Sequence, residues 1–325
     1  MAAAPDRPSP CRPDRPDARR RAWLLALVAT GAATGTGCAW RAIPGWDYSP
    51  PCFALTHEGA PGRVVLLASV HAGLSRFYPL PDPIEHAFAR AGRLIVEIDV
   101  AARGPEIRAA AAAHALLPDG ATLHAALRPQ TRDALRRAFR DQPWVLVERA
   151  RLQPWAWTLL LPDADDERLG ADPREGVETH LIARARARGL PVLELESADA
   201  QVRAFAGGPL DEQDAALALR LAQREAQSRT YVRIVDAWRR GDLAALAELK
   251  DRVYPPEGPL RALRGRLFAE RDERIADALA RALQVPGEAM AVIGALHLAG
   301  PDALQHALRR RGVSVEPGTG PDAPA

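Results

Sequence analysis

Short apolar runs alternate with long segments of helical periodicity along the chain. An apolar run without alternating polar residues is typical of a strand buried on both faces, as in a parallel sheet. Residues 53–56, a turn at 59–62 and the apolar run at 63–67 together predict a hairpin. Residues 313–315 predict a last short strand. The four runs that predict buried strands lie at 63–67, 93–99, 190–196 and 288–294.

The segments between these runs have the spacing of amphipathic helices. They lie at 83–91, 104–161, 177–188, 211–251, 258–284 and 302–311. Strand, helix, strand units at both ends of the chain predict an α/β fold with a mostly parallel central sheet. Because neither end has enough strands by itself, we expect both ends to contribute to one sheet. The central helices then form a large insertion or cap over that sheet.

The first 38 residues have the order of an export signal. Three arginines at 19–21 precede a short apolar run at 23–29 and a stretch of small residues that includes Cys38. This is the order of a charged region, an apolar region and a cleavage zone. The apolar run is far shorter than the roughly 20 residues that span a bilayer. We therefore expect residues 1–38 to be a leader that directs the protein to the periplasm or cell envelope.

Cys38 stands where the lipidated cysteine of a lipoprotein would stand, so it is the candidate for membrane attachment. The paired arginines leave twin-arginine and general secretory export both open. The plain alternative is a disordered leader with a chance apolar patch. We expect residues 39–52 to be a linker, 53–317 the folded domain and 318–325 a disordered tail.

Charge and cysteine content narrow the function classes. The 43 basic and 41 acidic residues leave a formal charge of +2, which argues against a nucleic-acid partner bound by a broad basic surface. Lys250 is the only lysine. The three cysteines, Cys11, Cys38 and Cys52, show neither CxxC nor zinc-finger spacing, so a structural zinc site is not expected.

Two segments look alike and place a histidine beyond an apolar strand. They are residues 66–73, with His71, and residues 292–300, with His297. In an open parallel sheet, ligands bind beyond the carboxyl ends of the strands, where both histidines are expected. Glu97 and Asp99 also end a strand, and their spacing of two predicts that they share one face. Residues 194 and 196 repeat this pattern.

Two histidines and several carboxylates at one sheet edge would suit a divalent transition metal such as Mn, Co or Zn. An open coordination position on such a metal could activate water. Without a metal, a histidine oriented by a glutamate could act as a base. The plain alternative is a pair of loop histidines beside surface carboxylates. Arg271 lies in the charged run 267–275, where it either belongs to a solvated helix face or clamps an anion.

A series of motifs, in order from about 53 to 317, resembles the TraB/GumN family, which is related to the Tiki metalloproteases. Each motif is short, and the series gives the resemblance its specificity. The motifs are the first histidine segment with residues 77–81 and 94–99, Pro154-Trp155, Gly176-Val177-Glu178, residues 189–192 with 195–197, residues 238–243, Glu270-Arg271-Asp272 and Gly294-Ala295-Leu296-His297.

The resemblance implies an α/β fold in which the two histidine segments are related by pseudo-symmetry. It also implies a metal-dependent hydrolase that cleaves a peptide or protein substrate. The family residues carry over to His71, Glu97, Arg271 and His297, with the two histidines and Glu97 as metal ligands. Arg271 would then clamp a developing oxyanion. Glu178 and Glu196 also carry over, and Asp99 is a further candidate.

One departure from the family pattern concerns the first histidine motif. Ala68 stands where the family has glycine, and alanine adopts positive φ less readily, so we expect the turn that aims His71 to differ. Two alternatives to a hydrolase remain. A distant similarity to ChaN-like lipoproteins, which are associated with haem, favours a haem- or peptide-binding envelope protein without catalysis. The other alternative is a non-catalytic scaffold in which Ala68 marks a lost site.

Overall fold

A computed structural model describes residues 48–161, 171–224 and 227–319. The described residues form a six-stranded sheet in the order β4-β3-β5-β2-β1-β6. The first four strands in this order run parallel, whereas β1 pairs antiparallel with both β2 and β6. The strands are β1 (Cys52–His57), β2 (Gly62–Ser69), β3 (Leu94–Val96), β4 (Val192–Glu194), β5 (Gly287–Gly294) and β6 (Val313–Pro317).

Both ends of the chain meet at the centre of the sheet, as the sequence predicts. β2 and β5 pair in parallel from Gly62 opposite Gly287 to Ser69 opposite Gly294. Both strands are apolar and almost entirely buried, because helices cover both faces. The mostly parallel α/β sheet is therefore confirmed. β3 and β4 are shorter than their apolar runs, and β4 is a partly exposed edge strand.

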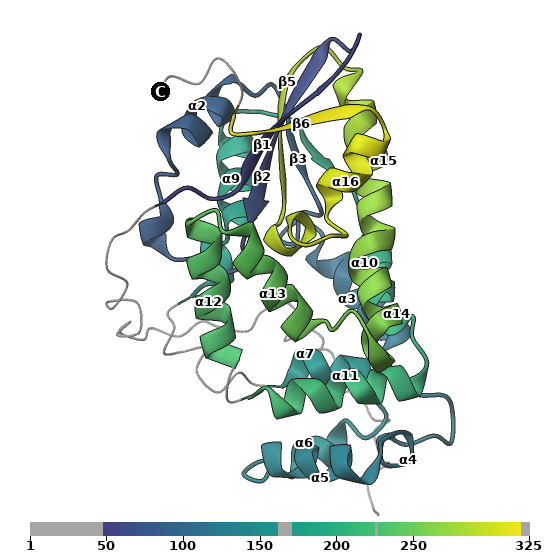
Figure 1. Ribbon diagram of the computed structural model, residues 1–325. Helices are drawn as coiled ribbons and strands as arrows, with labels where there is room; N and C mark the ends of the chain where they lie inside the picture. Colours follow the sequence, from purple (N-terminus) through teal and green to yellow (C-terminus); the bar gives the residue numbers. More distant parts are fainter. Residues whose placement is uncertain (1–47, 162–170, 225–226, 320–325) are drawn as a thin grey trace, which may run out of the picture.

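Helices cover the sheet on two sides (Figure 1). α2 (Asp82–Arg90) and α9 (Val177–Ala187) lie on one side, and α15 (Glu270–Leu283) and α16 (Leu304–Arg310) on the other. α9 begins directly after Gly176 and presents buried Val177, Leu181 and Ala185 toward the core. These apolar positions recur every three to four residues, which places them on one helix face.

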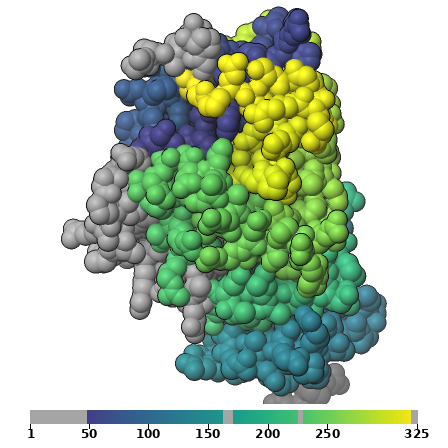
Figure 2. All heavy atoms as spheres, in the orientation of Figure 1, coloured from purple at the N-terminus to yellow at the C-terminus, as the bar shows by residue number. Residues whose placement is uncertain are grey.

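The central part of the chain forms the predicted helical insertion, beyond the carboxyl ends of the parallel strands (Figure 1). Its far end, which includes α4 to α6, forms the teal lobe most distant from the sheet (Figure 2). Trp157, Phe139 and neighbouring leucines build a separate apolar cluster there. Its helices are α3 (Gly104–His114), α4 (Leu123–Ala126), α5 (Pro129–Ala138), α6 (Trp144–Glu148), α7 (Pro154–Leu160), α10 (Ala198–Ala206), α11 (Leu210–Ala222), α12 (Gln227–Arg239) and α13 (Leu243–Val253).

One long helix contains a π-helical turn. α14 (Arg261–Arg264) continues through the π turn η7 (Gly265–Ala269) into α15. Such turns are rare and are found frequently at functional sites. The remaining short helical turns are η3 (Ser75–Phe77), η4 (Pro173–Glu175), η6 (Gly258–Leu260) and η8 (Ala295–Leu298).

The expected leader 1–38, with Cys38, and most of the expected linker lie outside the described residues. The expected tail 318–325 begins with two described residues: Gly318 N–H donates to Cys52 O at 2.8 Å, and Thr319 is buried. Within the described ranges, no helix combines the length and the apolar character needed to cross a membrane.

Candidate functional site

Glu97 lies at the centre of the site, at the bend that follows β3. Its Oε1 accepts a hydrogen bond from Gly294 N–H at 2.6 Å, and its Oε2 accepts one from Arg271 Nη2 at 2.5 Å. Burial opposes ionisation of this carboxyl, but His297, Arg271 and His71 outweigh burial and lower its pKa to about 2. Glu97 is therefore an anion at neutral pH.

His297 follows β5 in η8 and is buried. Its Nδ1 hydrogen-bonds with Asp272 Oδ1 at 2.5 Å, and its ring packs 5.2 Å from the ring centre of Phe268. Burial raises the pKa of Asp272, although His297, Lys250 and Arg271 act in the opposite direction. With Nδ1 engaged, the ring presents Nε2 toward Glu97, 3.9 Å from Oε2. The Asp272 contact thus fixes the orientation of the imidazole.

His71 reaches the same place from β2, but its side chain is 70% exposed. Its Nδ1 lies 3.7 Å from Glu178 Oε2, and Glu178 Oε1 accepts a hydrogen bond from Glu97 N–H at 3.1 Å. Burial and the nearby charge of Glu97 raise the pKa of Glu178 well above its ordinary value. The separation of 3.7 Å is too long for a hydrogen bond, and a small turn of the exposed ring would close it.

The glycine of the Gly176-Val177-Glu178 motif explains how Glu178 arrives there. A Cβ on Gly176 would lie 2.3 Å from His71 O, so only glycine allows the start of α9 to approach this closely. Val177 N–H then donates to Val70 O at 3.1 Å, which anchors α9 beneath the first histidine segment. Glu178 follows on the first turn of α9 and faces His71.

Gly294 provides empty space between the three donor side chains. A Cβ on Gly294 would lie 3.2 Å from Glu97 Oε1, 3.4 Å from His71 Nε2 and 3.7 Å from His297 Cδ2. Its φ of −53° and ψ of 134° are open to any residue. Ala68, which stands where the family has glycine, lies inside β2, and no described non-glycine residue has positive φ, so this chain needs no positive φ at that position.

Arg271 holds two carboxylates together. It donates from Nε to Glu196 Oε1 at 2.8 Å and from Nη2 to both Glu196 and Glu97. Its Nη1 donates to Leu267 O across the π turn at 3.2 Å. Of its five N–H donors, this leaves one Nη1 hydrogen without a partner among the described residues. Arg271 therefore orients Glu97 and Glu196 and has little capacity left for a substrate oxyanion.

Asp99 is not brought into this cluster. It forms an ion pair with Arg186, and its N–H donates to Glu194 Oε1 at 2.9 Å. Glu194 also pairs with Arg103 at 2.6 Å. The expected sharing of one face by Glu97 and Asp99 fails because β3 ends at Val96 and the chain bends at Glu97, where strand alternation stops.

The family of the chain follows from its similarity to known proteins. The family model of the TraB/PrgY/gumN family matches residues 53–317. The chain belongs to this family. It is 26% identical over 271 residues to the protein named "Uncharacterized protein YbaP" of Escherichia coli (strain K12), a match that covers 83% of this chain and 96% of the relative. The protein of the same name from Shigella flexneri matches to the same extent.

The TraB/PrgY/gumN match begins in β1 and ends in β6, so it contains the whole sheet and both histidine segments. The resemblance predicted from the series of motifs is confirmed. This region also contains residues in or beside the candidate site that the sequence did not single out as site residues: Asp272, Ser69 and Lys250. Asp272 adjoins Arg271 in its motif, and Ser69 precedes His71 by two residues.

Lys250 had a different signal, since it is the only lysine of the chain and lies in an apolar helix. It is completely buried, and its Nζ donates to Ala299 O at 3.1 Å and to Asp302 Oδ1 at 3.0 Å. The ammonium also lies 4.3 Å from the ring centre of Phe268. These contacts hold the segment after His297 against α13.

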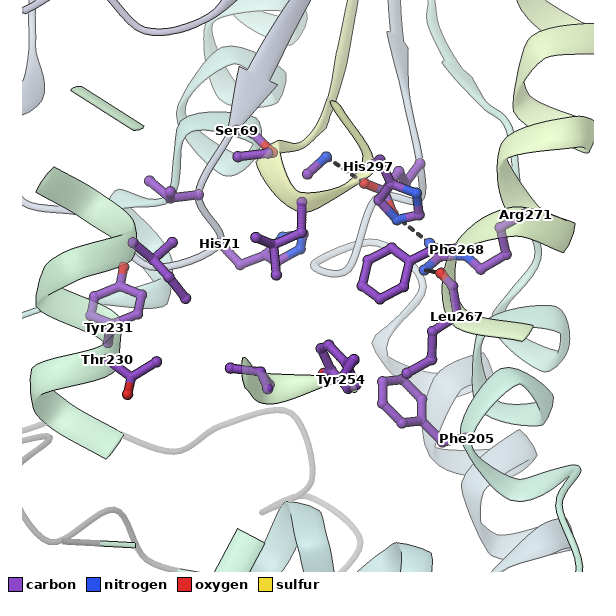
Figure 3. A pocket seen from close by; sticks show the side chains of 17 residues that line it. Ser69, His71, Phe205, Thr230, Tyr231, Tyr254, Leu267, Phe268, Arg271 and His297 are labelled. Atoms are coloured by element: carbon purple, nitrogen blue, oxygen red, sulfur yellow. Dashed lines mark hydrogen bonds and ion pairs between the residues drawn. The ribbon is translucent and has the colours of Figure 1, made fainter. Parts of the chain in front are cut away.

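A cavity of about 400 Å³ opens below His71 and His297 (Figure 3). Its polar end contains Ser69, His71, Glu97, Arg271 and His297. Below them lie Phe268, Phe205 and Tyr254, with Tyr231 across the cavity on α12 (Figure 3). The site is therefore a concave pocket with polar groups at one end, as small-molecule and substrate sites generally are.

Within the described ranges, no three His, Cys, Asp or Glu side chains are grouped closely enough to hold a metal ion. The donor chemistry nevertheless fits a transition metal, because two imidazoles and a permanent carboxylate face the space left by Gly294. The exposed ring of His71 is the donor that can move inward at least cost. A metal would therefore be held by His71, Glu97 and His297.

Proposed function

We propose that this TraB/PrgY/gumN protein is a metal-dependent hydrolase that cleaves peptide bonds. One observation carries the proposal: His71 and His297, which follow the adjacent parallel strands β2 and β5, and Glu97 all lie within 3.7 Å of the position that a Cβ on Gly294 would take. Each histidine also has a carboxylate facing its Nδ1, Glu178 for His71 and Asp272 for His297. Carboxylates in this position orient metal-binding histidines and raise their basicity.

The two buried glutamates differ in charge in a way that suits acid–base chemistry. Glu97 has a pKa of about 2 and stays ionised, whereas burial keeps the pKa of Glu178 well above its usual range. Neighbouring carboxyl groups with divergent pKa values commonly divide the roles of anion and proton carrier. We assign Glu97 as the permanent anion of the centre and Glu178, with its raised pKa, as the carboxyl group that orients His71 and exchanges a proton there.

The remaining residues act by position. Arg271 fixes the carboxylate of Glu97, and Asp272 fixes the tautomer and direction of His297. A bound divalent metal would polarise the peptide carbonyl and lower the pKa of a water molecule. The cavity below the centre receives the substrate and keeps water from its apolar walls.

For the protein's location, the leader-like order of residues 1–38 supports export to the cell envelope, with lipid attachment at Cys38.

The experiment measures metal content and peptide hydrolysis in the same preparations. Full-length protein is loaded with Mn²⁺, Co²⁺ or Zn²⁺, freed of excess metal, and assayed by elemental mass spectrometry. A mixture of peptides is then incubated with it, and new termini are read by mass spectrometry. We expect close to one metal per wild-type chain, and loss of both metal and cleavage in His71→Ala and His297→Ala.

His306→Ala is the matched control, because His306 is an exposed histidine on α16, away from the site. It should retain metal and activity, and circular dichroism should show that all variants are folded. Equal and negligible metal in wild type and variants would contradict the proposal. A haem titration then follows, since a Soret band that disappears in His71→Ala would identify the haem-binding alternative.

A further inference from the structure

The cavity beside the two histidines has walls of very different character at its two ends. Away from the polar end, the lining is mostly apolar and aromatic, with Phe205, Ile234, Tyr254, Leu267 and Phe268, and the uncharged polar residues Thr230 and Tyr231 of α12 lie beside them. These side chains come from α10, α12, the end of α13 and the π turn η7, so four separate elements converge on one apolar wall. The π turn places Leu267 and Phe268 toward the cavity just before Arg271, as Figure 3 shows.

The polar end contains an unpartnered group. Ser69 lines the cavity with only 2% of its surface exposed, and its Oγ has no hydrogen-bond partner among the residues that the structure describes. A buried hydroxyl without a partner is costly unless a ligand or ordered water satisfies it. It lies opposite Gly294 in the register of β2 and β5, directly beside the donor side chains.

We propose that this cavity binds a large apolar side chain, such as leucine or phenylalanine, from the residue next to the cut peptide bond. The apolar wall takes the side chain, and Ser69 Oγ hydrogen-bonds to the backbone of the same residue. As a statement about a substrate, this inference rests on the proposed hydrolase function. As a statement about a binding site, it can be tested separately.

Cavity size and chemistry limit the occupant. The cavity volume of about 400 Å³ is at the lower end of the range for ligand pockets, so the cavity has room for one bulky side chain and its backbone. A charged side chain would lose its hydration against Phe205, Ile234 and Leu267, and among the described residues this part of the lining holds no opposite charge to compensate. Filling an apolar pocket with a large rather than a small side chain changes specificity by roughly 10- to 100-fold.

The test uses metal-loaded full-length protein and five peptides that differ at one position, which carries Leu, Phe, Ala, Glu or Lys. Cleavage beside that position is followed by mass spectrometry, and kcat/KM is compared. We expect Leu and Phe to exceed Ala, Glu and Lys by at least about 10-fold. Ile234→Arg, which places a charge in the apolar wall, should abolish this preference. Leu159→Arg is the matched control, because Leu159 is an apolar residue 41% exposed on α7.

The possible results separate the two proposals. Cleavage without any side-chain preference, or a preference that Ile234→Arg leaves intact, overturns the pocket while the hydrolase function stands. If no peptide is cleaved, binding of N-acetyl-phenylalaninamide and N-acetyl-glycinamide is measured by calorimetry. Binding of the phenylalanine compound alone, lost in Ile234→Arg and weakened in Ser69→Ala, supports the pocket. Equal or undetectable binding of both compounds overturns it.

Discussion

The space at Gly294 leads to a sharp prediction for Gly294→Ala. The added methyl group would lie 3.2 Å from Glu97 Oε1 and 3.4 Å from His71 Nε2, in the volume that the three donor side chains surround. The backbone itself tolerates alanine, since φ is −53° and ψ is 134°. The variant therefore tests the function of the empty space without straining the chain.

The effect on stability should be small. A Cβ 3.2 Å from an oxygen requires a shift of a few tenths of an ångström, and crowding of this kind costs about 1–3 kcal/mol. Replacing glycine at a compatible φ and ψ stabilises by about 0.4–1 kcal/mol through the unfolded chain. We expect the free energy of unfolding to fall by no more than about 2.6 kcal/mol.

The effect on metal binding should be large. A methyl group between the donors prevents His71 and His297 from closing on one ion together with Glu97. Mn²⁺ affinity should therefore fall by at least about 100-fold. Mutation of a residue that only hydrogen-bonds to a metal ligand typically lowers affinity by about 10- to 100-fold. Urea unfolding and calorimetric Mn²⁺ titration measure the two effects. Gly92→Ala is the control, because a Cβ there meets its nearest atom, Glu288 O, at 3.7 Å. Wild-type Mn²⁺ affinity in folded Gly294→Ala would refute the assignment of this space to a metal.

Three further predictions concern the residues behind the centre. Burial and the charge of Glu97 raise the pKa of Glu178 in the folded state above its ordinary value of 4.5, so the contribution of this group to wild-type stability falls as pH rises above that value. Glu178→Gln has no such proton to lose. Above pH 4.5, its free energy of unfolding, measured in urea melts, should therefore rise relative to wild type by at most about 1.4 kcal/mol per pH unit. Parallel pH profiles of the two proteins would contradict this. Asp272→Asn replaces the carboxylate that hydrogen-bonds with His297 Nδ1, so it should weaken Mn²⁺ binding by about 10- to 100-fold in a calorimetric titration. Unchanged affinity would argue that Asp272 does not orient His297 for a metal. An amine-acylating reagent should leave the buried Lys250 unmodified in the folded protein and modify it in urea, with the N-terminal amine as internal standard. Rapid labelling of Lys250 in the folded protein would show that its side chain is not buried.

The sequence predicted the sheet well because its strands are unbroken apolar runs. It also placed His71 and His297 together, since both follow strands of the same direction. It could not separate Glu97 from Asp99, because the end of β3 depends on tertiary packing and not on the local pattern. Strand alternation therefore overestimated how many of these carboxylates share one site.

Other features of the site were beyond the sequence for a geometric reason. Asp272 and Arg271 are neighbours on one helix, yet Asp272 meets His297 while Arg271 meets Glu97 and Glu196. Consecutive helix residues point about 100° apart, so the two side chains diverge, but which partner each one meets is decided by segments far away in the sequence. The role of Gly294 could not be predicted either, because the absence of a Cβ beside Glu97, His71 and His297 shows only once the three side chains are brought together.

The parallel pairing of β2 with β5 also ties the site to the completion of the chain. Gly62 pairs with Gly287, so the central contact of the sheet joins segments from opposite ends of the sequence. The β1–β2 hairpin can form early during synthesis, but the partner of the other edge of β2 is β5, which is made more than 200 residues later. Such long-range pairing slows folding. A chain that stops before residue 287 contains His71, Glu97 and Arg271 but lacks Gly294 and His297. Incomplete chains therefore cannot assemble the centre, however much of the helical insertion they have folded.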